Sequence, residues 1–175
     1  ADTDKMGTEM PYLFGLDSNG LMYCVKSIMG LPLEAFSDIY FTILHKHNLR
    51  YKLLEMMQIQ FERLGIAHKT HVYELWESTS SQPETLYHTV VGNHITGAVL
   101  FKDGDSYFTT EVYPENMLYI FPLDGLQVVN PQNKSYVTID EQYYITNIIE
   151  KKIVSRFFCA GGYSIEAVSY THLTL

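Results

Sequence analysis

Cysteine is scarce in this sequence. Only two of its 175 residues are cysteines, Cys24 and Cys159, and both stand in apolar surroundings far apart in the chain. Two such residues do not make the disulfide framework of a small secreted domain, so we expect reduced thiols and a cytoplasmic protein. Long hydrophobic runs are lacking as well. No apolar stretch approaches the ~20 residues of a membrane-spanning helix, and no signal-peptide pattern opens the chain, so we expect no membrane span.

Positive charge is the second shortage. The chain has 12 Lys and Arg residues against 20 Asp and Glu residues, which gives a formal net charge of −8. A nucleic-acid backbone requires clustered basic residues, so this balance argues against DNA or RNA as a partner. It does not exclude small phosphates that are bound through a cation. The remaining composition, with 46% hydrophobic and 18% charged residues, is typical of one globular domain with a sizeable core.

Short apolar runs alternate with helical patterns through the first hundred residues. Runs rich in β-branched and aromatic residues indicate strands, whereas apolar residues that recur every three or four positions indicate helices. The sequence predicts strands over 38–44, 69–75 and 97–102, and helices over 21–31, 48–66 and 84–91. Such alternation is typical of a parallel sheet with helices on both faces.

The pattern changes after Pro122. Residues 134–140 and 142–151 flank Asp140-Glu141 as the two arms of a hairpin, and 156–167 has the composition of a further strand. We therefore expect a mixed sheet, in which a parallel core is extended by an antiparallel part that closes over the site.

Two carboxylates follow the third predicted strand. In "VLFKDGDSYF" (99–108), Asp103 and Asp105 stand on either side of Gly104. A tight Asp-Gly turn is the simplest explanation. However, ligands of parallel sheets bind beyond the carboxyl ends of the strands, which is where these acids lie. One or two carboxylates suffice for a Mg²⁺ ion that also binds phosphate oxygens, so the turn and the metal site both stay open here.

A capping box precedes the last predicted helix. Ser81 and Glu84 have the spacing at which the two side chains satisfy each other's backbone N–H groups, and Pro83 suits the first turn. Capping alone explains Ser81 and Glu84. Helix starts also suit phosphate or nucleotide binding, and Gln82 has an amide that both donates and accepts, as reading a base edge requires. Capping and nucleotide contact are both open for this segment.

The order of these segments resembles the sugar-phosphate nucleotidyltransferases, whose Rossmann-like fold is shared with GT-A glycosyltransferases. The resemblance is carried by residues 1–31, 79–90, 98–108, 134–152 and 159–167. It implies an α/β fold of three layers, the Rossmann-like GT-A arrangement, with a mostly parallel mixed sheet and an antiparallel C-terminal hairpin. It also implies a single domain over residues 1–167 from which the family's first strand and its C-terminal part are missing. The last eight residues, "VSYTHLTL" (168–175), resemble a translated sequencing-library adapter from a metagenomic assembly and are left out of the functional reasoning.

The resemblance implies a role for each matching residue. Asp105, helped by Asp103, would bind Mg²⁺ or Mn²⁺. Lys5 and Lys151 would be catalytic residues that balance phosphate charge. The nucleotide would contact Gly7, Ser81, Gln82, Glu84 and Asp105, and the sugar phosphate would face Glu150, Gly161 and Gly162.

The implied function is transfer of a nucleotidyl group from an NTP to a sugar phosphate or similar small phosphate, in the synthesis of precursors for bacterial surface polysaccharide. The sequence departs from the family at two points. The loop Thr3–Gly7 lacks the Gly-x-Gly-x-Arg pattern, and Tyr12 follows Pro11 where the family has a lysine. Two alternatives therefore stay open. One is a GT-A glycosyltransferase that binds an NDP-sugar through Asp103-Gly104-Asp105, and the other is a non-catalytic nucleotide-binding relative.

Overall fold

The computed structural model describes residues 12–124 and 133–167. Lys5, Gly7 and the loop Thr3–Gly7 lie outside the described residues, as does the tail 168–175. Among the described residues, no helix is both long and apolar enough to cross a membrane.

The first half of the chain contains a parallel pair of strands. β1 (Ile39–Leu44) and β2 (Thr70–Leu75) lie side by side in parallel, with Ile39 opposite Thr70. The connection between them is helical, made of α2 (His45–Tyr51) and α3 (Leu53–Arg63). This strand–helix–strand unit confirms the predicted alternation over residues 38–75. The shorter elements of this half are α1 (Tyr23–Lys26) and the 3-10 helices η2 (Tyr12–Phe14), η3 (Leu33–Ala35) and η4 (Ala67–Lys69).

The helix predicted over 48–66 is divided in two. Lys52 adopts the left-handed conformation, with φ of 52°, and separates α2 from α3. The side-chain oxygen of Asn48 accepts a hydrogen bond from the backbone N–H of Leu54 at 2.9 Å, which satisfies a donor at the start of α3. Beyond the break, Leu53, Met57 and Phe61 follow one another every four residues and are fully buried in the main apolar core.

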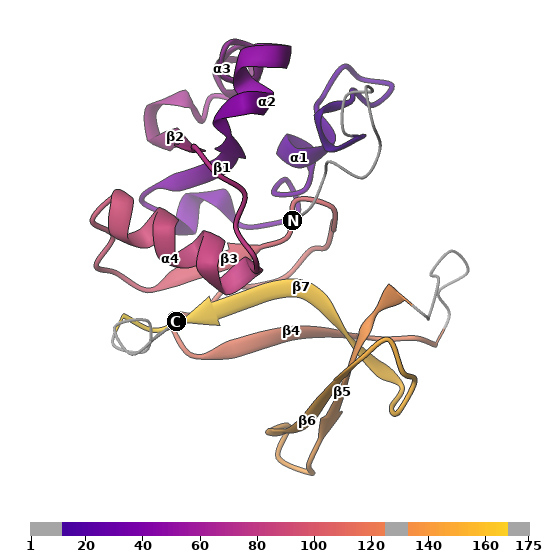
Figure 1. Cartoon of the computed structure of the whole chain (residues 1–175). Coiled ribbons are helices and arrows are strands. Elements are labelled where there is room, and N and C mark those ends of the chain that lie inside the picture. The colour runs from indigo at the N-terminus through magenta and orange to yellow at the C-terminus, as the bar shows by residue number, and fades with distance from the viewer. Residues whose placement is uncertain (1–11, 125–132, 168–175) are drawn as a thin grey trace.

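The second half of the chain forms an antiparallel sheet around its longest strand, β7 (Phe157–Ile165). β7 pairs with β3 (Val99–Lys102), β4 (Met117–Pro122) and β5 (Ser135–Ile139), and β5 pairs in turn with β6 (Ile145–Glu150). The predicted hairpin is confirmed, because β5 and β6 pair antiparallel. In the turn between them, Oδ1 of Asp140 accepts hydrogen bonds from the backbone N–H groups of Gln142 and Tyr144. β4 was missed by the sequence analysis. Figure 1 shows the β5–β6 hairpin reaching away from the helical half of the molecule.

The position of β3 corrects the prediction of a mostly parallel sheet. The sequence placed residues 97–102 beside the two parallel strands, but β3 runs antiparallel to β7 and, among the described residues, pairs with neither β1 nor β2. Of the strand pairs that residues 12–124 and 133–167 form, one is therefore parallel and four are antiparallel. An apolar run indicates a strand but not its partner, and the nine residues of β7 offer enough length for three partners.

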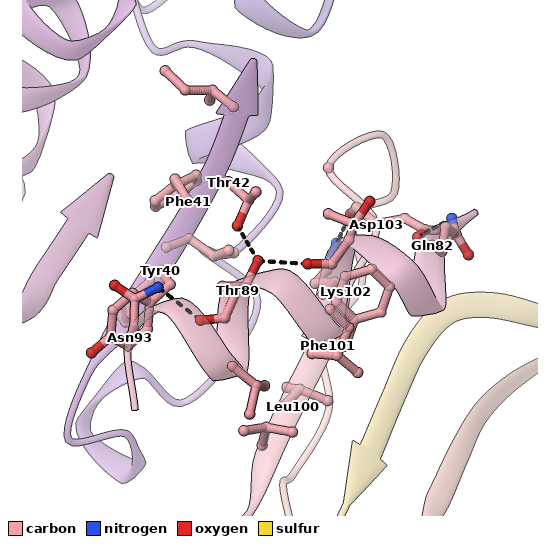
Figure 2. Close-up of a pocket in the computed structure, with 18 of the residues that line it drawn as sticks. Tyr40, Phe41, Thr42, Gln82, Thr89, Asn93, Leu100, Phe101, Lys102 and Asp103 are labelled. Carbon is pink, nitrogen blue, oxygen red and sulfur yellow. Dashed lines mark hydrogen bonds between the residues drawn. The ribbon is translucent and has the colours of Figure 1, made fainter. Parts of the chain in front are cut away.

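α4 (Gln82–Gly92) lies between the two sheets. Its N-terminus begins at Ser81, as predicted from the capping box. The hydroxyl groups of Thr89 on α4 and Thr42 on β1 are hydrogen-bonded at 2.8 Å, while α4 crosses β3 in Figure 2. The helix therefore links the parallel pair to the antiparallel sheet.

Candidate functional site

Asp103 lies where three distant parts of the chain meet. It is the first residue after β3, and its backbone N–H donates to the carbonyl oxygen of Gly161 on β7 at 2.7 Å. Its Oδ1 accepts a hydrogen bond from Nε2 of Gln82, the first residue of α4, at 2.6 Å. Figure 2 shows Gln82 and Asp103 at the same end of α4. The structure thus brings together a predicted metal ligand and a predicted nucleotide contact.

Two glycines of β7 permit this close approach. Gly161 has φ of +79°, and a Cβ on it would lie 2.5 Å from Oδ2 of Asp103. A Cβ on Gly162 would lie 2.7 Å from the ring of Phe108. A side chain at either position would therefore displace atoms of the protein itself. Both glycines were predicted to leave room for a sugar, and the structure gives them a second reason, since Asp103 and Phe108 pack against them.

The pKa of the Asp103 carboxyl group lies close to neutral pH. Burial raises the pKa of Asp103 to about 6, and the negative charge of Asp105 contributes to the increase. The positive charges of Lys102 and Lys134 act in the opposite direction. Two carboxylates that repel each other are the arrangement that a bound cation relieves.

Lys102 holds the loop after β3 in place. Its ammonium group donates to the backbone oxygen of Asp103 at 3.1 Å, to the hydroxyl of Ser106 at 3.1 Å and to the backbone oxygen of Ser106. Nζ also lies 4.9 Å from the centroid of the Phe108 ring. Burial lowers the pKa of Lys102 to about 8, although the carboxylates of Asp103 and Asp105 act to raise it. The sequence analysis missed Lys102, and its place directly before Asp-Gly-Asp was the available signal.

Asp105 differs from Asp103 in its exposure. It lies in the turn after β3 and its side chain faces solvent. Its charge reaches Tyr12, whose pKa is raised mainly by burial and further by Asp105. Gly104 and Asp105 form a turn, which confirms the turn predicted from the sequence.

The oxygens present at this loop suit a hard divalent cation. Oδ1 of Asp103 is bonded to Gln82, which leaves Oδ2 of Asp103 and the exposed carboxylate of Asp105 as oxygen donors. Carboxylate oxygens are the ligands that Mg²⁺ prefers, and the ion commonly takes only one or two of them together with phosphate oxygens. Among the described residues, no group of three or more His, Cys, Asp or Glu side chains has the spacing of a metal site. A cation here would therefore depend on ligand oxygens as well.

Ser81 and Glu84 are engaged in capping α4. The hydroxyl of Ser81 accepts from the backbone N–H of Glu84 at 3.3 Å. The carboxylate of Glu84 accepts from the backbone N–H of Ser80 at 2.5 Å and from its hydroxyl at 2.6 Å. The capping box is thus confirmed, with Ser80 in the reciprocal position. Of the side chains predicted to contact a nucleotide in this segment, Gln82 is the one that bonds to Asp103.

Glu150 is the last residue of β6, and the next residue, Lys151, is its ion-pair partner. Their side chains form a salt bridge of 2.9 Å, and both are about two-thirds exposed. Lys151 has φ of 58°, and its backbone N–H donates to the carbonyl oxygen of Lys134 at 2.8 Å. Neither side chain is hydrogen-bonded to Asp103 or Asp105. Lys134, whose positive charge does act on Asp103, was not named as a site residue by the sequence analysis, although it opens the segment 134–152 that carries the resemblance.

Comparison with known proteins shows similarity in fold only. No family model matches the sequence, and no curated protein matches it either. The structure is similar to that of the inositol-1-phosphate CTP transferase from T. maritima, with a TM-score of 0.71 and 14% sequence identity over 96% of this chain and 66% of that one. It is also similar to the nucleoside-diphosphate-sugar pyrophosphorylase from Vibrio cholerae RC9, with a TM-score of 0.71 and 18% identity over 94% of this chain and 69% of that one. This chain thus spans about two thirds of the length of each, and it shares their fold.

Proposed function

We propose that this chain, with the fold of sugar-phosphate nucleotidyltransferases, binds a nucleoside triphosphate at the carboxyl end of β3. The observation that carries the proposal is the meeting of Asp103, Gln82 and Gly161 at one point, with the exposed Asp105 next to it. The likeness in fold to a CTP transferase and to a nucleoside-diphosphate-sugar pyrophosphorylase supports a nucleotide as the ligand. The three-layer Rossmann-like GT-A arrangement of the complete domain belongs to this proposal.

In this proposal, Oδ2 of Asp103 and the carboxylate of Asp105 hold a Mg²⁺ or Mn²⁺ ion. The ion supplies neutralising charge to the phosphates. Gln82 orients Asp103 through its amide N–H, and Lys134 adds positive charge on the β5 side of the site. Lys5 and Lys151 remain predicted catalytic residues, Gly7 remains a predicted nucleotide contact, and Glu150 remains a predicted contact of the sugar phosphate.

The reaction we propose is nucleotidyl transfer to a sugar phosphate or similar small phosphate. An oxygen of the acceptor phosphate attacks the α-phosphorus of the NTP, the bond between the α-phosphorus and the bridging oxygen breaks, and pyrophosphate leaves. Positioning and charge neutralisation carry most of the catalysis in phosphoryl chemistry. A product of this class would serve as a precursor of surface polysaccharide.

Two other functions are favoured by particular observations. The pair Asp103 and Asp105 on one turn also suits an enzyme that binds the diphosphate of an NDP-sugar, as a GT-A glycosyltransferase does. The loop Thr3–Gly7, which lacks the Gly-x-Gly-x-Arg pattern, and Tyr12 in place of a lysine favour binding without turnover.

Binding measurements with Asp105→Asn test the proposal. We expect the unchanged chain to bind an NTP in a Mg²⁺-dependent manner, and Asp105→Asn to weaken that binding about tenfold or more, because one cation ligand is lost. Glu141→Gln is the matched control, since it removes an exposed carboxylate in the β5–β6 turn and should leave affinity unchanged. Titration calorimetry with ATP, CTP, GTP, UTP and dTTP, each with Mg²⁺ or EDTA, is the measurement.

The outcomes separate the three functions. Preference for an NDP-sugar over every NTP would favour the glycosyltransferase, and Mg²⁺-dependent binding without pyrophosphate release would favour the non-catalytic relative. Equal affinity of Asp105→Asn and the unchanged chain would refute the cation site.

A further inference from the structure

β6 is the outermost strand of the antiparallel sheet. The strand order is β3-β7-β5-β6, so in the described part of the chain β6 pairs with β5 on one side only. Five of its six residues are exposed, and Figure 1 shows the β5–β6 hairpin projecting from the rest of the molecule. The backbone N–H and C=O groups along the outer edge of such a strand can pair with another chain.

The side chains of this edge are apolar although they are exposed. Tyr143 and Tyr144 in the turn are exposed by 77% and 72%, and Ile145 and Ile148 on β6 by 45% and 51%. Proteins commonly protect a free edge with lysine, proline or other charged residues. The β6 strand reads Ile-Thr-Asn-Ile-Ile-Glu, and its one charged residue is the last. An edge of this composition is typical of an interaction surface.

The inner strand of the hairpin fixes its position. Tyr136 and Val137 of β5 are fully buried and pair with β7. Across the hairpin, the hydroxyl groups of Thr138 and Thr146 are hydrogen-bonded at 2.8 Å. A partner that binds the outer edge therefore meets a strand that is already ordered, which reduces the entropic cost of association.

Charge is distributed unevenly along the hairpin. The tip, which is the turn of residues 140–144, carries Asp140 and Glu141 and has a formal charge of −2. The base, where β5 begins and β6 ends, carries three lysines and one glutamate, which give a formal charge of +2: Lys134, Glu150, Lys151 and Lys152. One end of the hairpin is thus acidic and the other basic.

A hairpin of this kind is complementary to a second copy of itself. A two-fold axis perpendicular to the sheet makes two β6 strands antiparallel and places the tip of each hairpin beside the base of the other. With the axis at Thr146, Tyr144 lies opposite Ile148 of the partner subunit, and Glu141 lies opposite Lys151 of the partner subunit. Parallel pairing would instead bring the two acidic tips together, which is unfavourable.

We propose that β6 is the interface through which two copies of this chain form a symmetric dimer. The antiparallel sheet then continues from one copy into the other through the paired outer edges of Ile145–Glu150. Apolar contacts and backbone pairing supply the affinity, and the opposite charges of tip and base fix the direction. The interface does not include Gln82, Asp103 or Asp105, so it is independent of the proposed nucleotide site.

A lysine in the centre of the edge tests the interface. The unchanged chain should form a concentration-dependent dimer, and Ile148→Lys should weaken it about tenfold or more, because a charge enters the apolar contact of each copy. Ile59→Lys is the matched control, since Ile59 on α3 is 55% exposed, and it should leave the dimer unchanged. Both isoleucines are about half exposed, so neither substitution should unfold the chain. Sedimentation equilibrium over a range of protein concentrations is the measurement.

Charge reversal tests the antiparallel direction. Glu141→Lys and Lys152→Glu should each weaken the dimer about tenfold, because like charges then meet at both symmetric contacts. The double variant should restore the affinity of the unchanged chain, because opposite charges face each other again. Added salt should reduce the differences between these proteins.

Hydrogen exchange locates the contact. Protection of the Ile145–Glu150 amides that increases with protein concentration would support the proposal, whereas protection confined to other strands would overturn it. A chain that is monomeric at every concentration would also overturn it, as would a dimer that Ile148→Lys and Ile59→Lys weaken equally. Additive losses in the double charge variant would refute the antiparallel arrangement.

Discussion

Asp103 combines burial, a repelling neighbour and one strong hydrogen bond. Oδ1 is bonded to Gln82, and Oδ2 faces the Cα of Gly161 so closely that a Cβ would collide with it. The group that makes the site is therefore also a group that destabilises the fold when it is ionised, because a buried carboxylate has lost part of its hydration. Function and stability are coupled at this residue.

The stability of the chain should fall as pH rises from about 4 to about 6. The pKa of Asp103 is raised in the folded state to about 6, above its unfolded value of about 3.9. The neutral form thus favours folding below pH 4, and this contribution is lost as the pH passes 6. We expect the loss to reach about 1 to 2 kcal/mol, since the side chain keeps some contact with solvent.

Asp103→Asn isolates this contribution. The asparagine oxygen can still accept from Gln82, but the side chain has no charge to bury, so the variant should be more stable than the unchanged chain at pH 7 and equal to it near pH 4. Urea unfolding at both pH values is the measurement. Parallel pH profiles for the two proteins would show that Asp103 does not cause the dependence.

Gly161→Ala should destabilise the fold by about 1 to 3 kcal/mol. The substitution meets two penalties, a positive φ and a Cβ that lies 2.5 Å from Oδ2 of Asp103. Gly20→Ala is the control for φ alone, since Gly20 has φ of +74° and no atom near its Cβ position, and we expect it to cost about 1 kcal/mol. Thermal unfolding compares the two. A smaller cost at Gly161 than at Gly20 would contradict the close contact with Asp103.

At the scale of the element, the start of α4 divides two roles between different residues: some cap the helix, and another contacts the candidate site. The Ser81 and Glu84 side chains satisfy N–H groups at the helix start, whereas Gln82 projects to Asp103. The capping box orders the first turn of α4 and thereby positions Gln82. It supports the candidate site in this way without contacting a ligand.

Substitutions at the start of α4 should separate these roles. Ser81→Ala should lower stability by about 1 kcal/mol through loss of the cap, with NTP affinity unchanged. Gln82→Ala should weaken Mg²⁺-dependent NTP binding about tenfold, because Asp103 loses its orienting donor. Calorimetric titration and urea unfolding of both variants are required. Weakened NTP binding in Ser81→Ala at full stability would instead assign Ser81 a direct contact.

At the scale of the whole molecule, α4 and the loop after β3 connect the two sheets. The bond between Thr42 and Thr89 links β1 to α4, and the bond between Gln82 and Asp103 links α4 to the antiparallel sheet. Between these bonds lies a cavity of about 1130 Å³ that is lined by β1 and β3, which do not pair with each other in the described part of the chain. This architecture explains why apolar side chains of β1 remain half exposed.

Much of the secondary structure could be predicted from the sequence. Periodicity predicted β1, β2, β3 and the β5–β6 hairpin, and the spacing of Ser81 and Glu84 predicted the start of α4. These features depend on residues that are neighbours in the chain, so the sequence alone can predict them. The break at Lys52 was missed because a single left-handed residue has a weak local pattern. The β4 strand was missed although its six residues, Met-Leu-Tyr-Ile-Phe-Pro, are mostly apolar.

The sequence by itself determined a single α/β chain with acids at the end of an apolar strand, because composition and periodicity are local properties. Only the tertiary structure decided that β3 pairs antiparallel with β7, that Lys102 and Lys134 act on Asp103 beside the predicted Gln82 and Gly161, and that β1 and β3 line one cavity. These features depend on contacts between segments distant in the chain, whose energies come from burial and pairing in three dimensions. These energies cannot be predicted from a local pattern of residues.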